Sequence, residues 1–477
     1  MSRLLPLSLA AVVFTAPSVP PASNVDALAR EVQQAAVPVD RLIQNGKVEH
    51  RPGTAIAREV SSLSGVDATW IGWQVPMVDG RRDMCSWWST DNWAVRGQWM
   101  EPTSFTGGER PQIAQPAGPV PLEAGTNMLV LLRVVRGEIE RMHLVTGDCP
   151  LDAGGRTVVW LDAVPAAESL RYLETLTALD TASPTARMTL DSRRSMASSA
   201  VGAIALHRDA GADAILDRLV GSTDNSLRRQ AGSRLASYRG AHGFDVLRKL
   251  IGTERDQETR RSFVASLAQT RQPGTAEALL ALARTDTDAR VRAEAIGGYI
   301  RVTGSAGLQN ALAVVNQDAE DSVKSRAISA LASLPNNEGA PHLVTLARSN
   351  ASPAVRRSAV SNLGRMTDRA AQDALLSFAR TDTDPKVRSE AIYQYVRSTG
   401  EPGVANALSV MDKDADDAVK RRVVSAIAGL PNNTGVPHLI TLARNNTNMA
   451  VRKEAVSALG RSKDPRATAY LEELIKR

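Results

Sequence analysis

The chain is poor in cysteine and in aromatic side chains. Only two of its 477 residues are cysteine, and only 4% are Phe, Trp or Tyr. Two cysteines exclude a small fold held together by many disulfides, and they exclude any metal site that needs four cysteine ligands. A content of 43% hydrophobic and 23% charged residues excludes a disordered chain and a protein with many membrane spans.

The few aromatic residues and the charges are unevenly distributed. Six of the seven tryptophans lie between Trp70 and Trp99, and none follows Trp160. Residues 1–190 carry 16 Lys and Arg against 20 Asp and Glu, whereas the remainder carries 41 against 31. The chain therefore consists of an acidic, Trp-rich part and a basic part without tryptophan.

The N-terminal residues are typical of a secretory signal. Residues 4–16 are uncharged and mostly apolar, and prolines at 17, 20 and 21 end this run before Ala22. The run is too short to cross a bilayer but has the length of a signal-peptide core. We therefore predict a signal peptide over residues 1–22 and a periplasmic or secreted protein, with no stable membrane anchor. A buried or loose N-terminal helix is the alternative.

The two cysteines, Cys85 and Cys149, both lie in the Trp-rich part. An oxidising compartment favours a disulfide between them. Closing a loop of this length would stabilise the fold by roughly 4 kcal/mol in the chain-entropy treatment. Two free buried thiols are the alternative.

Residues 23–180 are predicted to form a compact antiparallel β or α+β domain. Asp79-Gly80 is a strong hairpin turn, and Arg136-Gly137 marks a second one. The predicted elements are two hairpins, a strand and a helix, over residues 69–88, 128–145, 156–162 and 165–179. The residues suggest no known family for this domain.

The clustered tryptophans allow two interpretations. Exposed indoles stack on sugars or hold peptides, which would make a ligand platform of Trp87, Trp88, Trp93 and Trp99. Alternatively, these side chains form the core of a small domain that the disulfide supports.

Beyond residue 190 the sequence repeats every 32 residues. Eight copies of one core follow each other without insertion, and a ninth, degenerate unit begins near Met196. The copies begin at Leu227, Thr259, Val291, Val323, Val355, Val387, Val419 and Val451. A stronger period of 96 is superimposed, because residues 285–304 match residues 381–400 at 13 of 20 positions. A block of three units was copied.

Each unit is predicted to contain two amphipathic helices. In the second helix, apolar residues stand at the start and at positions +4, +5 and +8, which is one face of a 3.6-residue period. Three residues before each start stand Asp224, Asp256, Asp288, Glu320, Ser352, Asp384, Asp416 and Asn448. All of them except Glu320 are residue types that cap a helix N-terminus.

The pattern Asp-x-x-Val-Arg-x-x-Ala-[Ile/Val]-x-x-Leu resembles HEAT repeats, in particular the short repeats of the bilin-lyase-like class, over residues 196–477. The resemblance implies a mainly α chain. A right-handed α-solenoid of about nine 32-residue helix pairs would follow a linker at 181–195. In that family an Asp and the following Arg form a ladder of hydrogen bonds between neighbouring repeats. The matching residues are Arg228, Arg260, Arg292, Arg356, Arg388 and Arg452, with Asp288 and Asp384. Lys324 and Lys420 replace arginine at two positions and would weaken bidentate pairing there.

A second, less regular set of cations is the candidate for partner contacts. Its members at position +2 of their repeats are Arg229, Arg261, Arg357, Arg421 and Lys453, and those at position +10 are Arg301, Arg365, Arg397 and Arg461. Arg229, Arg261, Arg357, Arg397 and Arg421 are the first candidates among them. Tyr393 joins them, because it stands where the earlier block has Gly297. These residues would recruit an acidic protein partner, and a solvated charged face is the alternative. The ladder cations are expected to pair within the fold, so we expect no nucleic-acid binding.

Common catalytic and metal-binding motifs are missing from the sequence. It has no Gly-x-Ser-x-Gly, HExxH or phosphate-binding loop, and it lacks the His-Glu dipeptides of HEAT-like di-iron enzymes. We therefore predict an exported, non-catalytic binding or scaffold protein without a cofactor. The alternative is an enzyme, or an enzyme subunit, whose Trp-rich domain binds a glycan or a peptide.

Overall fold

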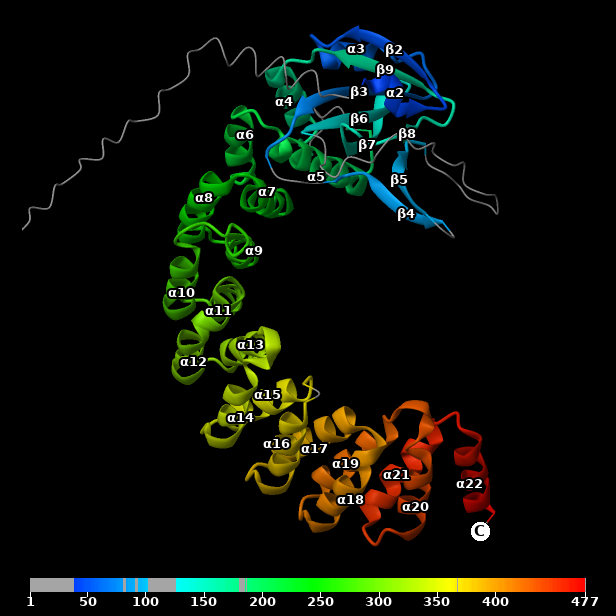
Figure 1. The fold of residues 1–477 in the computed structure, drawn as a ribbon, viewed down its shortest axis with the longest axis vertical. Helices are drawn as coiled ribbons and strands as arrows, with labels where there is room; N and C mark the ends of the chain where they lie inside the picture. The colour runs from blue at the N-terminus through cyan, green and yellow to red at the C-terminus, as the bar shows by residue number, and fades with distance from the viewer. Residues whose placement is uncertain are drawn as a thin grey trace, which may run out of the picture. The chain divides into compact units, whose positions relative to one another are not determined.

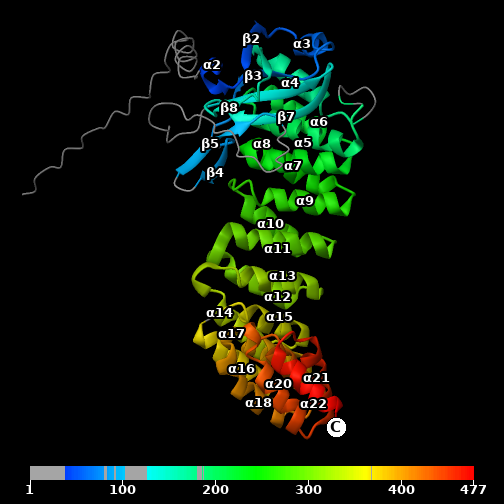
Figure 2. The ribbon, with the colours of Figure 1, turned by 90° about the vertical axis from the view of Figure 1, so that its right-hand side faces the viewer.

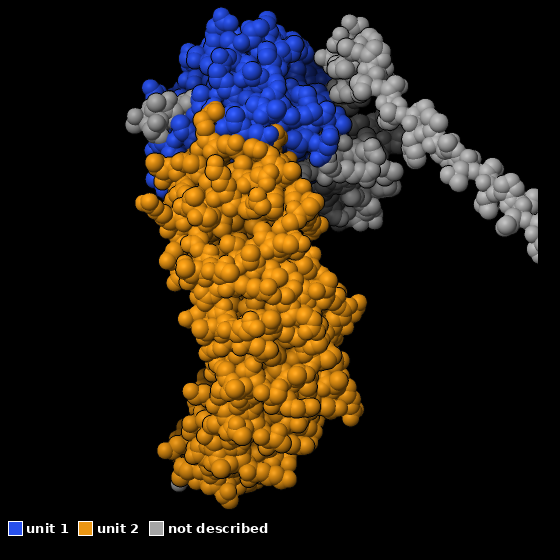
Figure 3. Space-filling model, turned by 90° about the vertical axis from the view of Figure 1, so that its left-hand side faces the viewer, with its two compact units in different colours: residues 1–215 blue, residues 216–477 orange. Residues whose placement is uncertain are grey.

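The computed structural model describes residues 38–79, 83–90, 93–101, 126–179, 185, 187–366 and 368–476, without the side chains of 87–90 and 93–96. The predicted signal peptide lies outside these residues. The chain divides into two compact units, residues 1–215 and 216–477 (Figure 3). The predicted linker at 181–195 overlaps helix α5 (Leu190–Leu206), which starts inside that range and belongs to the first unit.

The first unit contains two β-sheets. The larger sheet has the strand order β2 (Lys47–Pro52), β9 (Thr157–Asp162), β3 (Thr69–Pro76), β6 (Asn127–Val135), β7 (Glu138–Thr146). The smaller sheet has the order β1 (Ile43–Gln44), β8 (Leu151–Asp152), β5 (Trp93–Trp99), β4 (Ser86–Thr90). Strand β9 runs parallel to both of its neighbours, whereas β6 runs antiparallel to both of its own. The domain is therefore built on mixed sheets rather than on the antiparallel sheet that we also predicted.

One predicted hairpin is correct and the other is wrong. Strands β6 and β7 pair across Arg136 and Gly137, whose φ angles of 54° and 80° suit a tight hairpin turn. Strand β3 does not turn back at Asp79-Gly80; it lies between β6 and β9, and β4 pairs with β5. The reason is that β3 is buried on both faces, as a central strand is, and a central strand needs two neighbours.

Several tryptophans form the core of the first unit. Trp70 and Trp73 are fully buried, and Trp160 is nearly so. The Trp73 indole N–H donates to Ser169 Oγ on helix α4 (Ala166–Thr175), with Nε1 and Oγ 2.9 Å apart. Trp99 is half-buried, and the side chains of Trp87, Trp88 and Trp93 lie outside the described residues. The first unit also contains helices α2 (Val39–Leu42) and α3 (Ile56–Ser62).

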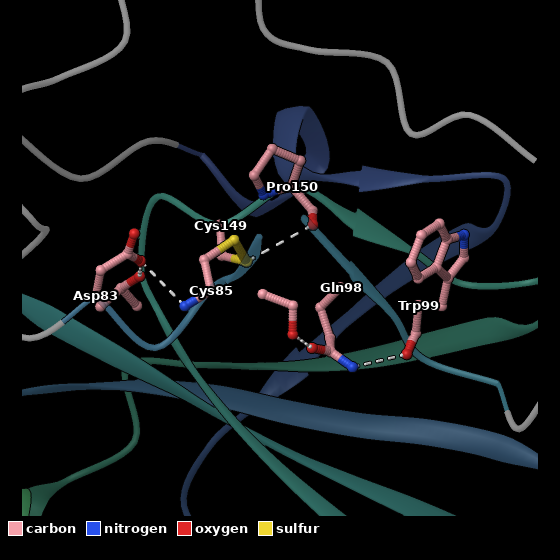
Figure 4. The surroundings of a disulfide bond; sticks show 8 residues. Asp83, Cys85, Gln98, Trp99, Cys149 and Pro150 are labelled. Carbon is pink, nitrogen blue, oxygen red and sulfur yellow. Dashed lines mark hydrogen bonds between the residues drawn. A yellow bond between two sulfur atoms is a disulfide. The ribbon is translucent and has the colours of Figure 1, made fainter. Parts of the chain in front are cut away.

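A disulfide joins Cys85 and Cys149, whose Cα atoms lie 5.5 Å apart (Figure 4). Cys85 directly precedes β4, and Cys149 lies between β7 and β8. The Cys85 backbone N–H donates to Asp83 Oδ1, which also accepts from the Thr146 hydroxyl near the end of β7. The bridge therefore attaches the β4 end of the smaller sheet to the end of β7 in the larger sheet.

The second unit is a stack of helix pairs with the predicted period (Figures 1 and 2). The first helices of the pairs are α6 (Gly211–Leu219), α8 (Gly240–Thr253), α10 (Thr275–Thr285), α12 (Leu308–Gln317), α14 (Ala340–Ser349), α16 (Arg369–Thr381), α18 (Val404–Lys413) and α20 (Val436–Asn445). The boundary between the two units falls within α6, after Ile215. The second helices are α7 (Asn225–Tyr238), α9 (Gln257–Leu267), α11 (Ala289–Thr303), α13 (Asp321–Leu331), α15 (Pro353–Leu363), α17 (Pro385–Thr399), α19 (Asp417–Ala428) and α21 (Met449–Arg461). Helix α22 (Pro465–Ile475) covers the end of the stack.

Each second helix contacts the second helix of the next pair, from α7 to α21. The second helices lie on the inner side of the curve that this unit makes, and the first helices lie on its outer side (Figure 1). Fully buried alanines, such as Ala327, Ala359 and Ala391, let neighbouring helices approach closely. The predicted mainly helical repeat region after a domain that contains β-strands is confirmed.

The predicted helix caps are confirmed in detail. The side chains at seven of the eight cap positions accept a hydrogen bond from a backbone N–H in the first turn of their own helix. Glu320, whose residue type is a poor cap, makes no such bond. Among the helices of the described part of the chain, none is long and apolar enough to cross a membrane.

Candidate functional site

The ladder arginines lie one residue after the repeat start, and most of them reach an acid 26 residues later, in the next repeat. Arg292 donates through Nε to Asp318 Oδ2 (2.8 Å) and through Nη2 to Asp318 Oδ1 (3.0 Å). Its Nη1 also donates to the Asp286 carbonyl at 2.9 Å, which ties the guanidinium to its own repeat. The equivalent pairs are Arg228–Glu254, Arg260–Asp286, Arg356–Asp382 and Arg388–Asp414.

The pairing with arginine affects the pKa of Asp318. Burial alone would raise the pKa of Asp318, but the hydrogen bonds from Arg292 and from the Glu320 backbone N–H outweigh burial and lower this pKa. The pKa of the Arg292 guanidinium is raised, chiefly because it donates to Asp318. Both groups therefore stay charged at neutral pH, and the ion pair between the two repeats is maintained.

The structure corrects the acidic half of the predicted ladder. Asp288 and Asp384 do not receive the arginines of the preceding repeats; each caps its own helix, with Oδ1 2.7 Å from a first-turn backbone nitrogen. The acid that accepts the arginine stands two residues before the cap. The reason is that the cap oxygen is already committed to the free N–H groups of its helix.

Arginine and acid are replaced together at two of the repeat interfaces. Where lysine replaces the ladder arginine, at 324 and 420, asparagine replaces the acid, at 350 and 446. Lys324 instead forms an ion pair with Asp321 in its own helix, at 3.6 Å. Arg452, in the last repeat, donates to the carbonyls of Asn446 and Thr447.

The candidate contact arginines fall into two groups. Arg261 pairs with Glu258 (2.7 Å) and approaches Glu294 (3.9 Å), and Arg397 donates to the Gly364 carbonyl at 3.2 Å. Arg229 is half-buried and lies near enough to Asp256 to help lower its pKa, an effect that comes first from the hydrogen bonds of Thr259. Arg357 and Arg421 are exposed and form no ion pair with a described residue.

Tyr393 is held under a neighbouring arginine. The guanidinium carbon of Arg422 lies 3.8 Å from the centre of the Tyr393 ring, and Arg422 also approaches Glu390 at 3.7 Å. In the earlier block, a Cβ added at Gly297 would lie only 2.8 Å from Arg326 Nε, so the equivalent arginine occupies that space. The ring face toward Arg422 is therefore covered, and a role of Tyr393 in partner binding stays a prediction.

A cavity of about 500 Å³ opens on the second helices α13 and α15. Its lining includes Arg357 and Asn362 from α15, Arg365 from the turn that follows α15, several serines from both helices, and Glu390 from α17. Sequence reasoning overlooked Asn362. The available signal was a polar residue at repeat position +7, where most repeats carry Gly, Ala or Ser.

A buried polar cluster lies in the first unit. Arg133 and the Trp70 indole both donate to Glu101, with Arg133 Nη2 2.9 Å from Oε2 and Trp70 Nε1 2.8 Å from Oε1. The His143 ring packs edge-on against Trp70, with ring centres 5.1 Å apart, and its Nδ1 has no partner among the described residues. Burial, together with the nearby Arg141, lowers the pKa of His143 to about 4.

Acid should therefore destabilise the first unit before its carboxylates titrate. In the unfolded chain the pKa of His143 has its ordinary value of 6.5. Between pH 6.5 and 4 this histidine is therefore protonated in the unfolded state but not in the folded state, and the free energy of unfolding decreases as the pH is lowered. We expect a loss of about 2 kcal/mol at pH 4, less than the full pKa difference because the ring is partly exposed. Urea denaturation followed by Trp fluorescence measures this loss. The variant His143→Gln should lack the slope in this range, and an unchanged slope would contradict the assignment.

Comparison with known proteins identifies the repeat region. The sequence matches HEAT repeats over residues 212–298, 308–395 and 404–477, together more than half of the chain. No curated protein matches the chain. Solved structures with a similar fold include human deoxyhypusine hydroxylase (16% identity, TM-score 0.25, covering 55% of this chain and 95% of that one). They also include the CpcE–CpcF complex of phycocyanin lyase from Nostoc sp. PCC7120 (15%, 0.21, 55% and 92%) and Kap95p, from a study of its binding to RanGDP (13%, 0.37, 62% and 50%).

These structural likenesses concern the fold alone. The repeat family, by contrast, is shown by the match over most of the second unit, together with the regular caps and the helix pairs described above. The chain belongs to the HEAT-repeat family, whose stacked helices form a scaffold that is often used in protein–protein interaction.

Proposed function

We propose that this chain is an exported, non-catalytic scaffold that binds a protein partner through the inner row of second helices. The observation that carries the proposal is that the arginines of this row are of two kinds, paired and unpaired. Most ladder arginines are paired between repeats, whereas Arg357, Arg365 and Arg421 are exposed and form no ion pair with a described residue. Exposed cations on the same row of helices, here in or directly after α15 and in α19, attract an acidic surface.

Two features support export. The uncharged run at residues 4–16 has the length of a signal core, and the Cys85–Cys149 disulfide suits an oxidising compartment. The alternative is an enzyme or enzyme subunit whose Trp87, Trp88, Trp93 and Trp99 bind a glycan or a peptide; of these, Trp99 is half-buried and the other three side chains lie outside the described residues.

Charge reversal on the inner row tests the binding surface. The double variant Arg357→Glu and Arg421→Glu should lose at least about tenfold of the partner captured from a periplasmic or secreted fraction, because each change replaces attraction by repulsion. Its melting temperature should stay within about 2 °C of the wild type, since both side chains are exposed.

A matched control reverses the same number of charges on first helices. Arg348 in α14 and Lys413 in α18 are exposed and have no ion pair with a described residue. Arg348→Glu with Lys413→Glu should capture the partner as the wild type does. Equal loss in both variants would show that net charge, rather than the inner row, governs capture, and no loss in either would refute the proposal.

A further inference from the structure

We propose that the cavity on α13 and α15 binds an acidic peptide segment of the partner in an extended conformation. This inference rests on the proposed function and assigns a ligand chemistry to one place on the inner row. The cavity has a volume of about 500 Å³, and serine hydroxyls from both helices contribute to its lining. Alanine 354 is its only apolar lining residue among those described, so the ligand that fits it is polar.

Asn362 supplies the first specific feature of the site. Its side chain is only 6% exposed, and its Nδ2 donates to the Ser358 carbonyl at 2.9 Å. A carbonyl only accepts, so this bond fixes the orientation of the amide and leaves Oδ1 as an acceptor. Oδ1 is buried and has no hydrogen-bond partner among the described residues.

Packing does not require a polar residue at this position, because the equivalent residues include Gly298, Ala330, Ala426 and Ala458. A buried acceptor without a donor is costly. The Asn362 Oδ1 atom therefore suits a backbone N–H of a peptide that enters the cavity, since every residue of an extended peptide except proline carries such a donor.

Charge identifies the rest of the ligand. The cavity is lined by two cations, Arg357 and Arg365, and both are exposed without an ion pair to a described residue. The two acids in its lining are already paired, because Asp321 contacts Lys324 at 3.6 Å and Glu390 approaches Arg422 at 3.7 Å. Glu390 also accepts from Gln394 Nε2 at 2.7 Å. Two positive charges therefore remain available, and carboxylates are the groups that arginine binds best in a peptide.

The spacing of the two arginines sets the spacing of the acids. Arg357 lies in α15, and Arg365 follows two residues after the end of this helix, across Gly364, whose backbone is also helical (φ −63°, ψ −10°). At the helical rise, the eight residues between them correspond to about 12 Å along the axis. An extended peptide rises about 3.3 Å per residue, so two of its carboxylates match this separation when they lie about four residues apart. The preferred motif is therefore Glu-x-x-x-Glu, or the same spacing with Asp.

Synthetic peptides of twelve residues test the site directly on the full-length, oxidised chain. One peptide carries two Glu four residues apart, a second carries them two residues apart, and a third has Gln at both positions. Fluorescence anisotropy should show that the first peptide binds at least about tenfold more tightly than the third, and about threefold more tightly than the second.

Three variants assign the contacts. Arg357→Ala with Arg365→Ala should weaken the first peptide at least about tenfold and abolish its preference over the Gln peptide. Asn362→Ala, which installs the residue found at position 330, should weaken all three peptides about threefold to tenfold and keep the melting temperature. Arg348→Ala on α14 serves as the control and should change nothing.

Several results would overturn the inference. They are equal binding of the Glu and Gln peptides, unchanged binding to the double arginine variant, or unchanged binding to Asn362→Ala. Competition by inorganic phosphate or by a single-stranded oligonucleotide as strong as that by the Glu peptide would also overturn it, because the site would then select anions in general. The peptide assay uses no natural partner. Its failure is therefore distinct from a failure of the charge-reversal capture experiment, which would refute the binding surface as a whole.

Discussion

Replacing Asp382 by alanine is expected to lower the free energy of unfolding of the second unit by about 4 kcal/mol. The substitution leaves the Arg356 guanidinium without its carboxylate at a site where the two side chains are only 10% and 5% exposed. The backbone carbonyl of Asn350, 3.0 Å from Arg356 Nη1, neutralises none of this charge. Chemical denaturation followed by circular dichroism measures the loss. Hydrogen exchange in α15 and α17 shows whether it is concentrated at this interface, as expected for a stack held together by its nearest neighbours.

The chain itself supplies the control for this experiment. The double variant Arg356→Lys and Asp382→Asn copies the pair that stands at 324 and 350. It removes the carboxylate and the guanidinium together, so no buried guanidinium is left without a carboxylate. It should cost about 1 kcal/mol, the scale of ordinary hydrogen bonds. A double variant as unstable as Asp382→Ala would show that side-chain shape rather than charge pairing holds the interface.

Removing the disulfide should destabilise the first unit by roughly 4 kcal/mol. The bridge closes a loop between residues 64 positions apart, and without it the unfolded chain gains the corresponding freedom. The double variant Cys85→Ala and Cys149→Ala avoids leaving a single reactive thiol. All seven tryptophans lie at or before Trp160, so urea denaturation followed by Trp fluorescence reports on the first unit alone.

The second unit provides an internal reference in the same sample. Its helices dominate the circular dichroism signal, and the transition seen by this signal should keep its midpoint in the double cysteine variant. Equal midpoints of Trp fluorescence with and without the bridge would contradict the entropic role assigned to it.

Features set by short stretches of sequence were predictable. The helix pairs and seven of the eight caps follow from residues within a few positions of each other, and the structure has them where the repeat pattern predicts. The β6–β7 hairpin is equally local. The hairpin expected at Asp79-Gly80 was wrong because the turn signal is local, whereas the neighbours of β3 come from residues 127–135 and 157–162.

The candidate site shows the same limit. The ladder arginines and Arg357 were identified from the repeat pattern, but two acids stand within three residues of each other at each interface that has an arginine–acid pair, as Asp382 and Asp384 do. Only the fold shows which of them faces the arginine. Asn362 is significant because its acceptor is buried without a partner, and no pattern of residue types reveals burial of a single atom.

The joint replacement of Arg–Asp by Lys–Asn has a consequence for how this array can change its length. Each paired ladder arginine meets an acid 26 positions later, so a 32-residue excision that begins between Arg292 and Asp318 would set Arg292 against Asn350. Excising three repeats would instead set Arg292 against Asp414, which preserves the match. Excising two repeats would match Arg292 with Asp382, but the same 64 residues would set Lys324 against Asp414. The smallest length change that keeps the ladder pairs matched wherever it falls in this part of the array is therefore 96 residues, which is the length of the block that was duplicated.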